Sequence, residues 1–270
     1  MAFISFEEAG YRYPGGFPAV EALNLAIEKG ENCAVVGQNG AGKTTMAKLC
    51  NRLLCPGEGN VFVDGKNTRD HSTAGISRIV GYVFQNPDDQ IFHSTVEKEV
   101  EFGPRMMKLP PERTRALVED ALALTGLAGE REENPYDLPL SARKFVTIAS
   151  IIAMDTGALI LDEPTAGQDP RGNRLLADII AALLRRGKTL ITISHDMDFV
   201  AENFSRVIVM ADRRIAADGS PEEVFWNFPA LEKARLKQPC VSGICRRLGI
   251  TGVTRRDDAA RAIMERFGPR

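Results

Sequence analysis

A glycine-rich loop with a lysine and two threonines is the stretch of this sequence best suited to chemistry. It follows the apolar run 33–36, which predicts a buried strand, and leads into 46–50, which predicts a helix. In this context the pattern GxxxxGK[ST] predicts a phosphate-binding loop (P-loop), because glycines let backbone N–H groups turn toward phosphate oxygens and a helix start favours negative charge. Lys43 is placed to reach the terminal phosphates of a nucleotide, and the Thr44 hydroxyl to hold Mg²⁺. The predicted nucleotide-binding residues of the loop are Gly37, Gln38, Asn39, Gly40, Ala41, Gly42, Lys43, Thr44 and Thr45.

Two adjacent carboxylates, Asp162 and Glu163, follow the apolar run 158–161 and complement the loop. At the end of a strand in the same sheet, Asp162 is predicted to hold Mg²⁺ and Glu163 to activate the attacking water as a general base. Gln85 and His195 also follow predicted strands, and ligands bind at the carboxyl ends of strands in open α/β sheets. Gln85 is suited to orienting water or metal, and His195 to contacting the γ-phosphate or supporting Glu163. These residues together predict a site that hydrolyses a nucleoside triphosphate.

Two tyrosines, Tyr11 and Tyr13, precede the turn at residues 14–16. An aromatic ring beside a nucleotide site can stack on the adenine, a contact worth about 1 kcal/mol. The alternative is a tyrosine that covers the edge of the sheet. Spacing alone does not separate the two.

The composition is that of an ordinary globular protein. Its 270 residues are 44% hydrophobic with a formal net charge of −2, which predicts no nucleic-acid partner. The longest apolar runs, such as 146–154, are about half the ~18 residues that a membrane span needs, and no signal peptide is evident. We therefore expect a cytoplasmic protein that meets a membrane only through partners. Five cysteines without zinc-type spacing predict reduced thiols, with Cys33 and Cys50 in the core.

The order of predicted elements indicates an α/β protein with a helical insertion. Strands are predicted at 2–9, 20–28, 59–65, 79–84, 158–161 and 189–194 and in a hairpin at 206–217, and a helix at 171–186. Helical periodicity at 111–124 and 143–154 predicts a helical subdomain at about 86–155. A capping sequence at Ser220 predicts a further helix start, and 226–270 predict a small α-helical appendage.

These motifs together resemble those of the ATP-binding cassette (ABC) ATPases. By this resemblance residues 37–45 are the Walker A motif, 159–162 the Walker B motif, Glu163 the catalytic carboxylate, Gln85 the Q-loop glutamine, Asp169 the D-loop aspartate and His195 the switch histidine. The resemblance covers roughly residues 2–225. It implies an ABC ATPase domain at 1–225 with the α/β fold of P-loop NTPases, a mixed β-sheet core, a helical subdomain and a small C-terminal appendage.

The same resemblance implies the cofactors and their ligands. ATP would be hydrolysed with Mg²⁺, which Thr44, Gln85 and Asp162 would hold. Lys43, Gln85, Glu163 and His195 would form the catalytic set. It also favours Tyr13 as the tyrosine that stacks on adenine.

A narrower resemblance links residues 85–92 and 225–248 to the ATPase subunits of energy-coupling factor (ECF) importers, which include the cobalt-transport ATPases. It implies ATP-driven uptake of a vitamin or of cobalt or nickel. The implied partners are a second ATPase subunit, a transmembrane coupling protein and a substrate-capture membrane protein, at the cytoplasmic face of the cell membrane. The appendage at 226–270 would hold the ATPase pair together. Residues 86–92 would line a groove for the coupling helices, where Asp88 and Asp89 either meet basic residues or form a solvated acidic loop.

The family's signature loop, LSGGQ, closes over the nucleotide of the opposite subunit, and this chain departs from it. The signature position holds Leu138, Pro139, Leu140, Ser141 and Ala142. Pro139 removes a backbone donor and Leu140 adds bulk where the backbone should approach the γ-phosphate, although Ser141 retains a hydroxyl. The D-loop differs too, with Gln168 where an apolar residue is usual. We therefore expect a heterodimer with a different ATPase that carries an intact signature; a homodimer is the alternative.

Three functions are compatible with these motifs. The first is the motor of an importer. The second, a soluble cassette ATPase acting on nucleic acid or ribosomes, is disfavoured by the single cassette, the missing coiled-coil insertion between Gln85 and Leu138 and the missing basic face. The third is a regulatory subunit with little turnover, which Glu163 and His195 disfavour and the altered signature favours. The importer explains most of the motifs, and the sequence does not identify its substrate.

Overall fold

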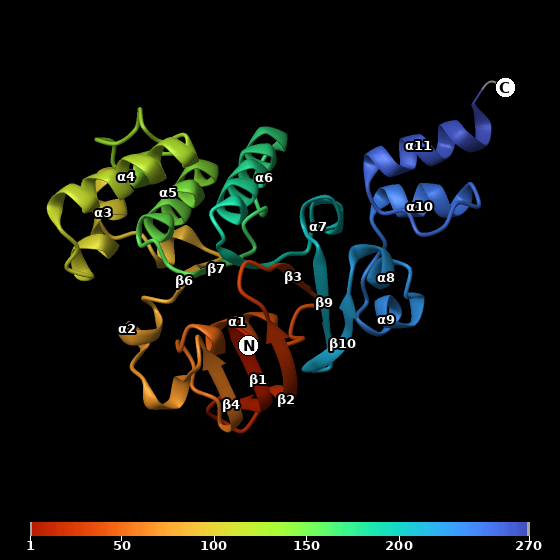
Figure 1. Ribbon diagram of the computed structural model, residues 1–270, viewed down its shortest axis with the longest axis horizontal. Helices are drawn as coiled ribbons and strands as arrows, with labels where there is room; N and C mark the ends of the chain where they lie inside the picture. Colours follow the sequence, from red (N-terminus) through yellow and green to blue (C-terminus); the bar gives the residue numbers. More distant parts are fainter. Residues whose placement is uncertain (1, 269–270) are drawn as a thin grey trace.

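The computed structural model describes residues 2–268 and arranges ten strands in two sheets (Figure 1). The four-stranded sheet has the order β2-β1-β4-β5, and the six-stranded sheet has the order β10-β9-β3-β8-β7-β6. The strands are β1 (Ile4–Arg12), β2 (Pro18–Ile27), β3 (Asn32–Val36), β4 (Glu58–Val63), β5 (Lys66–Asn67), β6 (Val80–Val83), β7 (Ala158–Asp162), β8 (Thr189–Ile193), β9 (Arg206–Ala211) and β10 (Arg214–Gly219).

The six-stranded sheet carries the phosphate-binding loop and the carboxylates. Strands β3, β6, β7, β8 and β9 are parallel, and β10 is an antiparallel edge strand. Every residue of β3, β7 and β8 is buried, as expected for parallel strands covered on both faces. Asp162 pairs with Ile193, and Ile193 pairs with Val35, so the carboxyl ends of these three strands are level. The segments that follow them therefore meet at one edge of the sheet.

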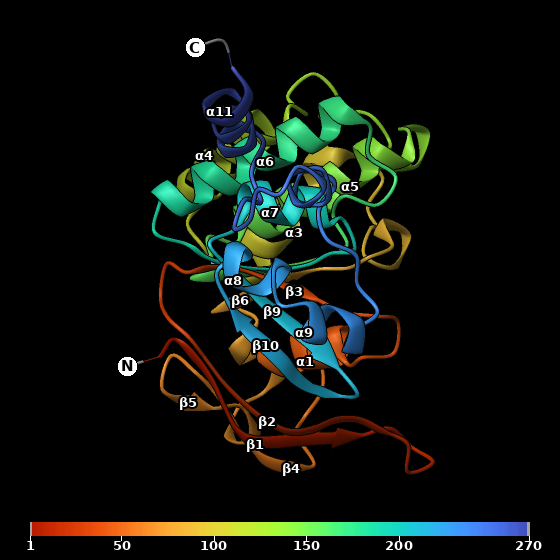
Figure 2. The same ribbon diagram turned by 90° about the vertical axis from the view of Figure 1, so that its right-hand side faces the viewer.

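Helices cover both faces of the six-stranded sheet. Figure 2 shows α3 to α6 on one side of the sheet, and β1, β2 and β4 as a separate layer beyond its other side. The helices are α1 (Lys43–Cys50), α2 (Thr73–Ile76), α3 (Val96–Met106), α4 (Pro111–Thr125), α5 (Leu140–Ala153), α6 (Pro170–Arg185), α7 (Met197–Asn203), α8 (Pro221–Phe225), α9 (Phe228–Lys233), α10 (Cys240–Arg247) and α11 (Arg256–Phe267). The α/β fold with a mixed sheet is therefore as the sequence predicts.

Several local predictions are confirmed by the structure. Val63 pairs with Lys66 across the predicted hairpin turn, and Ser220 forms a capping box with Glu223. The side chains of Cys33 and Cys50 are buried in the core. Three boundaries are wrong by three residues: α5 begins at Leu140 instead of 143, α1 begins at Lys43 instead of 46, and β1 continues to Arg12 instead of ending at 9. Both helices begin directly after the residue that ends the preceding loop, Pro139 or Gly42.

The C-terminal helices divide into two groups by their packing. Phe225 of α8 and Leu231 of α9 belong to the main apolar core. In contrast, Cys245 of α10 and Ala259 of α11 form a small apolar cluster with Ile250. Figure 1 shows α10 and α11 at the opposite end of the molecule from α3 to α5. The predicted domain boundary between residues 225 and 226 stays a prediction. The small cluster of α10 and α11 contains only residues that follow this boundary.

Candidate active site

The phosphate-binding loop ends in α1, which begins at Lys43 directly after Gly42. Gly42 has a φ of 101°, and a Cβ at this position would lie 2.4 Å from the carbonyl oxygen of Ala19, so only glycine fits. The Nζ of Lys43 donates to the carbonyl oxygens of Gly37 at 2.8 Å and Gln38 at 3.1 Å. Burial lowers the pKa of Lys43, whereas nearby Glu163 favours its charged form. The side chain of Lys43 is thus held against the phosphate-binding loop.

Asp162 is the last residue of β7 and is only 3% exposed. Its Oδ2 accepts a hydrogen bond of 2.7 Å from the Tyr82 hydroxyl. Its Oδ1 is buried and has no hydrogen-bond partner among residues 2–268. Buried polar atoms are normally satisfied, and carboxylate oxygens are preferred ligands of Mg²⁺. The unpartnered oxygen therefore fits a divalent cation at this carboxylate.

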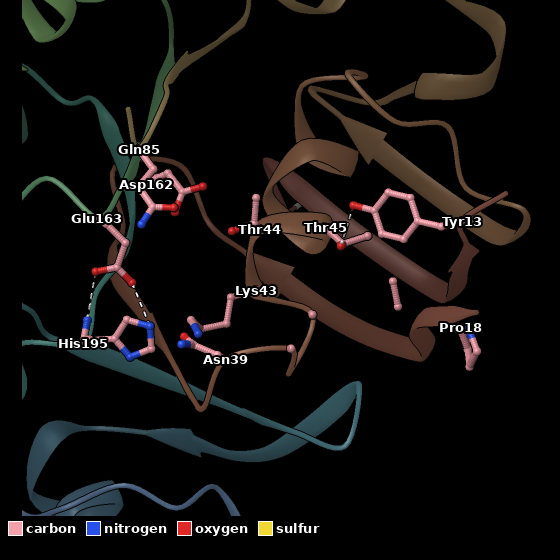
Figure 3. Close-up of a pocket in the computed structure, with 13 residues that line it drawn as sticks. Tyr13, Pro18, Asn39, Lys43, Thr44, Thr45, Gln85, Asp162, Glu163 and His195 are labelled. Atoms are coloured by element: carbon pink, nitrogen blue, oxygen red, sulfur yellow. Dashed lines mark hydrogen bonds and ion pairs between the residues drawn. The ribbon is translucent and has the colours of Figure 1, made fainter. Parts of the chain in front are cut away.

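Glu163 follows Asp162 in an unusual conformation, with a φ of 52°. The backbone N–H of His195 donates to its Oε2 at 3.2 Å, and the His195 Nε2 lies 3.2 Å from its Oε1 (Figure 3). Burial raises the pKa of Glu163 to about 7, although the hydrogen bond from His195 opposes this shift. Burial also lowers the pKa of His195, and the charge of Lys43 adds to this effect. A general base is most effective when its pKa lies near the working pH, and the pKa of Glu163 meets this condition near neutral pH.

These groups surround a cavity of about 270 Å³. Figure 3 shows Glu163 and His195 on one side and Tyr13 on the other, with Lys43 and Thr44 between them. This order matches a nucleotide with its terminal phosphate near the carboxylate and its base near the tyrosine. The predicted site residues that line the cavity are Tyr13, Asn39, Gly40, Gly42, Lys43, Thr44, Thr45, Gln85, Asp162, Glu163 and His195, joined by Pro18 and Ala19, which the sequence did not indicate.

The two tyrosines of the first hairpin differ in position. Tyr13 lines the cavity, and its hydroxyl lies 3.2 Å from the Thr45 Oγ1. Tyr11 packs its ring against that of Tyr13 in an edge-to-face contact with the ring centroids 5.1 Å apart, and it is not among the lining residues. Stacking on adenine stays a prediction for Tyr13.

The signature stretch and the D-loop lie outside this cavity. Leu140 begins α5 with a side chain that is 47% exposed, and Gln168 Nε2 donates to the carbonyl oxygen of Ser141 at 3.0 Å. Asp169 caps α6 by accepting from the N–H of Gly172 at 2.7 Å. Within one chain the two segments are therefore joined to each other.

Sequence reasoning missed two buried residues that hydrogen-bond to Asp162 and Glu163. Tyr82 bonds to Asp162 as described, and burial raises its pKa, so the hydroxyl stays protonated. Lys144 of α5 is buried, and its Nζ donates to the carbonyl oxygen of Glu163 at 2.9 Å. Tyr82 is a polar side chain inside the apolar run 79–84, and this was a signal available in the sequence, whereas Lys144 follows Arg143 at the edge of an apolar run and carried no such signal.

A phosphate-binding loop, an Asp-Glu pair and a histidine around one cavity at the carboxyl ends of parallel strands define a P-loop nucleotide-hydrolysing domain. Comparison with known proteins identifies the family. The sequence model of the ABC transporter family matches residues 20–166. The energy-coupling factor transporter ATP-binding protein EcfA of Methanocaldococcus jannaschii is 38% identical over 244 residues, which are 90% of this chain and 88% of that protein.

Two further similarities extend over most of the chain. EcfA of Methanothermobacter thermautotrophicus is 36% identical over 252 residues, covering 92% of this chain and 81% of that protein. The structure of cbiO1 from Clostridium perfringens, part of the ABC transporter complex cbiONQ, is similar with a TM-score of 0.78 and 33% identity, covering 92% of this chain and 99% of that chain. The chain therefore belongs to the ABC transporter family and is an ATPase of the cassette type, which confirms the resemblance seen in its motifs. Among residues 2–268, no helix combines the length and hydropathy needed to cross a bilayer.

Proposed function

We propose that this chain is the ATP-hydrolysing subunit of an ECF-type importer, which powers uptake of a vitamin or of cobalt or nickel ions. The observation that carries the catalytic part is the cavity that gathers Lys43, Asp162, Glu163 and His195. The similarity to EcfA proteins and to cbiO1 supports the importer. The chain would act at the cytoplasmic face of the membrane, through partners that cross it.

Nucleotide binding is assigned to the loop and to Tyr13. Backbone N–H groups of the loop and Lys43 would hold the phosphates, and the ring of Tyr13 would stack on the base. Thr44, Gln85 and Asp162 would hold Mg²⁺, which neutralises charge on the β- and γ-phosphates when bound. Asp162 suits this role because one of its oxygens is fixed by Tyr82 and the other is unpartnered.

Hydrolysis is assigned to Glu163 and His195. With its raised pKa, Glu163 can accept a proton from the attacking water near neutral pH. The backbone N–H of His195 orients the carboxylate, and the half-exposed imidazole faces the cavity, where it can contact the γ-phosphate. The Nζ of Lys144 donates to the backbone carbonyl of Glu163 and so helps to fix the residue.

An apolar groove of about 500 Å³ supports docking of a helix of the transmembrane coupling protein. Its walls include Tyr82, Phe84, Phe102 and Met154, and Phe92, which is 61% exposed. Exposed aromatic side chains around an apolar groove are typical of helix-in-groove recognition.

The two acidic residues of the loop beside the groove differ in their contacts, so they are not equally available to a partner. Asp88 forms an ion pair of 2.8 Å with Arg143 in its own chain. Among residues 2–268, the carboxylate of Asp89 accepts only one long hydrogen bond of 3.4 Å, from the side-chain amide of Asn86. We therefore assign contact with basic residues of the coupling protein to Asp89 rather than Asp88.

We further propose an asymmetric pair with a different ATPase that carries an intact signature. Leu140 presents its side chain at the start of α5, where the family has a glycine that lets the backbone approach a phosphate. The exposed apolar side chains of Ile244 on α10, Leu248 directly after it, and Met264 and Phe267 on α11 supply a surface that could hold the pair together. A homodimer that relies on Ser141 is the alternative.

The importer is tested by fractionation after co-expression with a candidate transmembrane coupling protein and a candidate substrate-capture membrane protein. The chain should sediment with membranes only when the coupling protein is present, and Phe92→Asp in the groove should release it. Glu119→Gln, an exposed substitution on α4, is the control. Cosedimentation with ribosomes or nucleic acid instead would contradict the proposal.

A further inference from the structure

Tyr82 contacts both the carboxylate of Asp162 and the apolar groove. It lies in β6 and is 4% exposed. Its hydroxyl donates to the Asp162 Oδ2 at 2.7 Å. Its ring lines the groove beside Phe84, with the ring centroids 5.0 Å apart and the planes at 60°.

The hydroxyl of Tyr82 determines how Asp162 presents its two oxygens. Because Oδ2 is engaged at 2.7 Å, the carboxylate is fixed with Oδ1 as the unpartnered atom. Hydrogen bonds of this kind orient metal ligands, and their loss typically costs about 10–100-fold in metal affinity. Tyr82 therefore has the geometry of a positioning residue rather than of a metal ligand.

The ring of Tyr82 ties this hydrogen bond to the groove. A hydroxyl hydrogen bond is best near 2.7 Å and weakens as its length and angle change. The ring and hydroxyl are one rigid unit, so a movement of the ring beside Phe84 changes the contact with Asp162. This connection is separate from Gln85, which reaches the nucleotide cavity from the end of the same segment.

We propose that Tyr82 positions Asp162 for Mg²⁺ and connects the metal site to the groove. The groove part rests on the proposed function, because there the groove receives the membrane partner. The positioning part needs only nucleotide and metal binding by the purified chain.

The positioning role is tested with Tyr82→Phe, which removes one hydroxyl and keeps the ring. Affinity for the non-hydrolysable ATP analogue AMP-PNP is measured by calorimetry with Mg²⁺ and with EDTA. The gain in affinity due to Mg²⁺ should fall about 10–100-fold in the variant, while the affinity in EDTA stays that of the wild type. Tyr136→Phe is the matched control, because it removes another 2.7 Å hydrogen bond, from its hydroxyl to the Ile91 carbonyl. If Mg²⁺ increased the AMP-PNP affinity of Tyr82→Phe as much as that of the wild type, the proposal would be overturned.

The connection to the groove is tested with Phe84→Leu, alone and combined with Tyr82→Phe. The leucine variant should reduce the gain from Mg²⁺ a few-fold, and this effect should disappear in the Tyr82→Phe background. Phe92→Leu is the control, since Phe92 packs on His93 and Phe102 instead. An equal effect of Phe84→Leu in both backgrounds would overturn the connection.

Failure of the importer would look different. A chain that never associates with membranes but whose Mg²⁺ gain depends on Tyr82 would contradict the importer and support the positioning role.

Discussion

Replacing Glu163 by glutamine is expected to stabilise the nucleotide-free protein above neutral pH while nearly abolishing ATP turnover. Burial raises the pKa of this carboxyl from its ordinary 4.5 to about 7. Below pH 4.5 the group is protonated in both the folded and unfolded states, so it contributes no difference. As the pH rises to 7, the unfolded chain releases the proton while the folded chain retains it, so the free energy of unfolding falls.

The size of this effect follows from the shift. Each pKa unit corresponds to about 1.4 kcal/mol, so the loss levels off above pH 7 at about 3 kcal/mol. Glutamine has nearly the same shape and does not ionise. The Glu163→Gln variant should therefore exceed the free energy of unfolding of the wild type by less than ~1 kcal/mol at pH 5 and by up to ~3 kcal/mol at pH 8.

Urea denaturation at pH 5 and pH 8, in EDTA and without nucleotide, measures this difference. Glu119→Gln on the surface of α4 controls for the loss of one negative charge. When each is assembled with the partner ATPase, the Glu163→Gln variant should turn over ATP about 10²–10⁴-fold more slowly than the wild type, the range for loss of a general base. An equal pH dependence of stability in Glu163→Gln and the wild type would refute the burial argument, and undiminished turnover would refute the general-base role.

Three further experiments test other parts of the site. Lys144→Met removes the hydrogen bond to the Glu163 carbonyl, so kcat of the assembled ATPase should fall about 10–100-fold with little change in KM; an unchanged kcat would show that the contact is dispensable. Tyr13→Ala should weaken ATP binding by about 1 kcal/mol in calorimetry, whereas Tyr11→Ala should change it less, and the reverse order would favour Tyr11 as the stacking residue. Replacing both Leu140 and Ser141 by glycine should raise turnover of the purified chain, and no gain in any assembly would count against a signature defect.

The phosphate-binding loop and the strand ends were predictable because their patterns are local. Glycine spacing, a lysine and an apolar strand lie within about fifteen residues of one another, and strand order in a parallel sheet brings Asp162 and His195 to the same edge. The contacts that hold these residues are not local. Tyr82 and Asp162 are 80 positions apart, and Lys144 and Glu163 are 19 apart.

The helix after Pro139 shows a different limit. Its start was placed too late because Leu140 and Ser141 were interpreted as loop, whereas proline is compatible with a helix that begins immediately after it. The sequence likewise gives no signal for the ion pair of Asp88 with Arg143, because the two residues are 55 positions apart. Long-range side-chain contacts of this kind depend on the folded backbone.

In the proposed asymmetric pair, this chain supplies Lys43, Glu163 and His195 and needs the signature of its partner to hydrolyse ATP. ATP turnover per subunit, measured as the concentration of the purified chain is raised, tests it most directly. The rate should stay at the level of the Lys43→Ala variant at every concentration and rise when an ATPase with an intact signature is added. A rate that climbs with concentration of this chain alone would contradict the claim and show that Leu140 and Ser141 form a working signature.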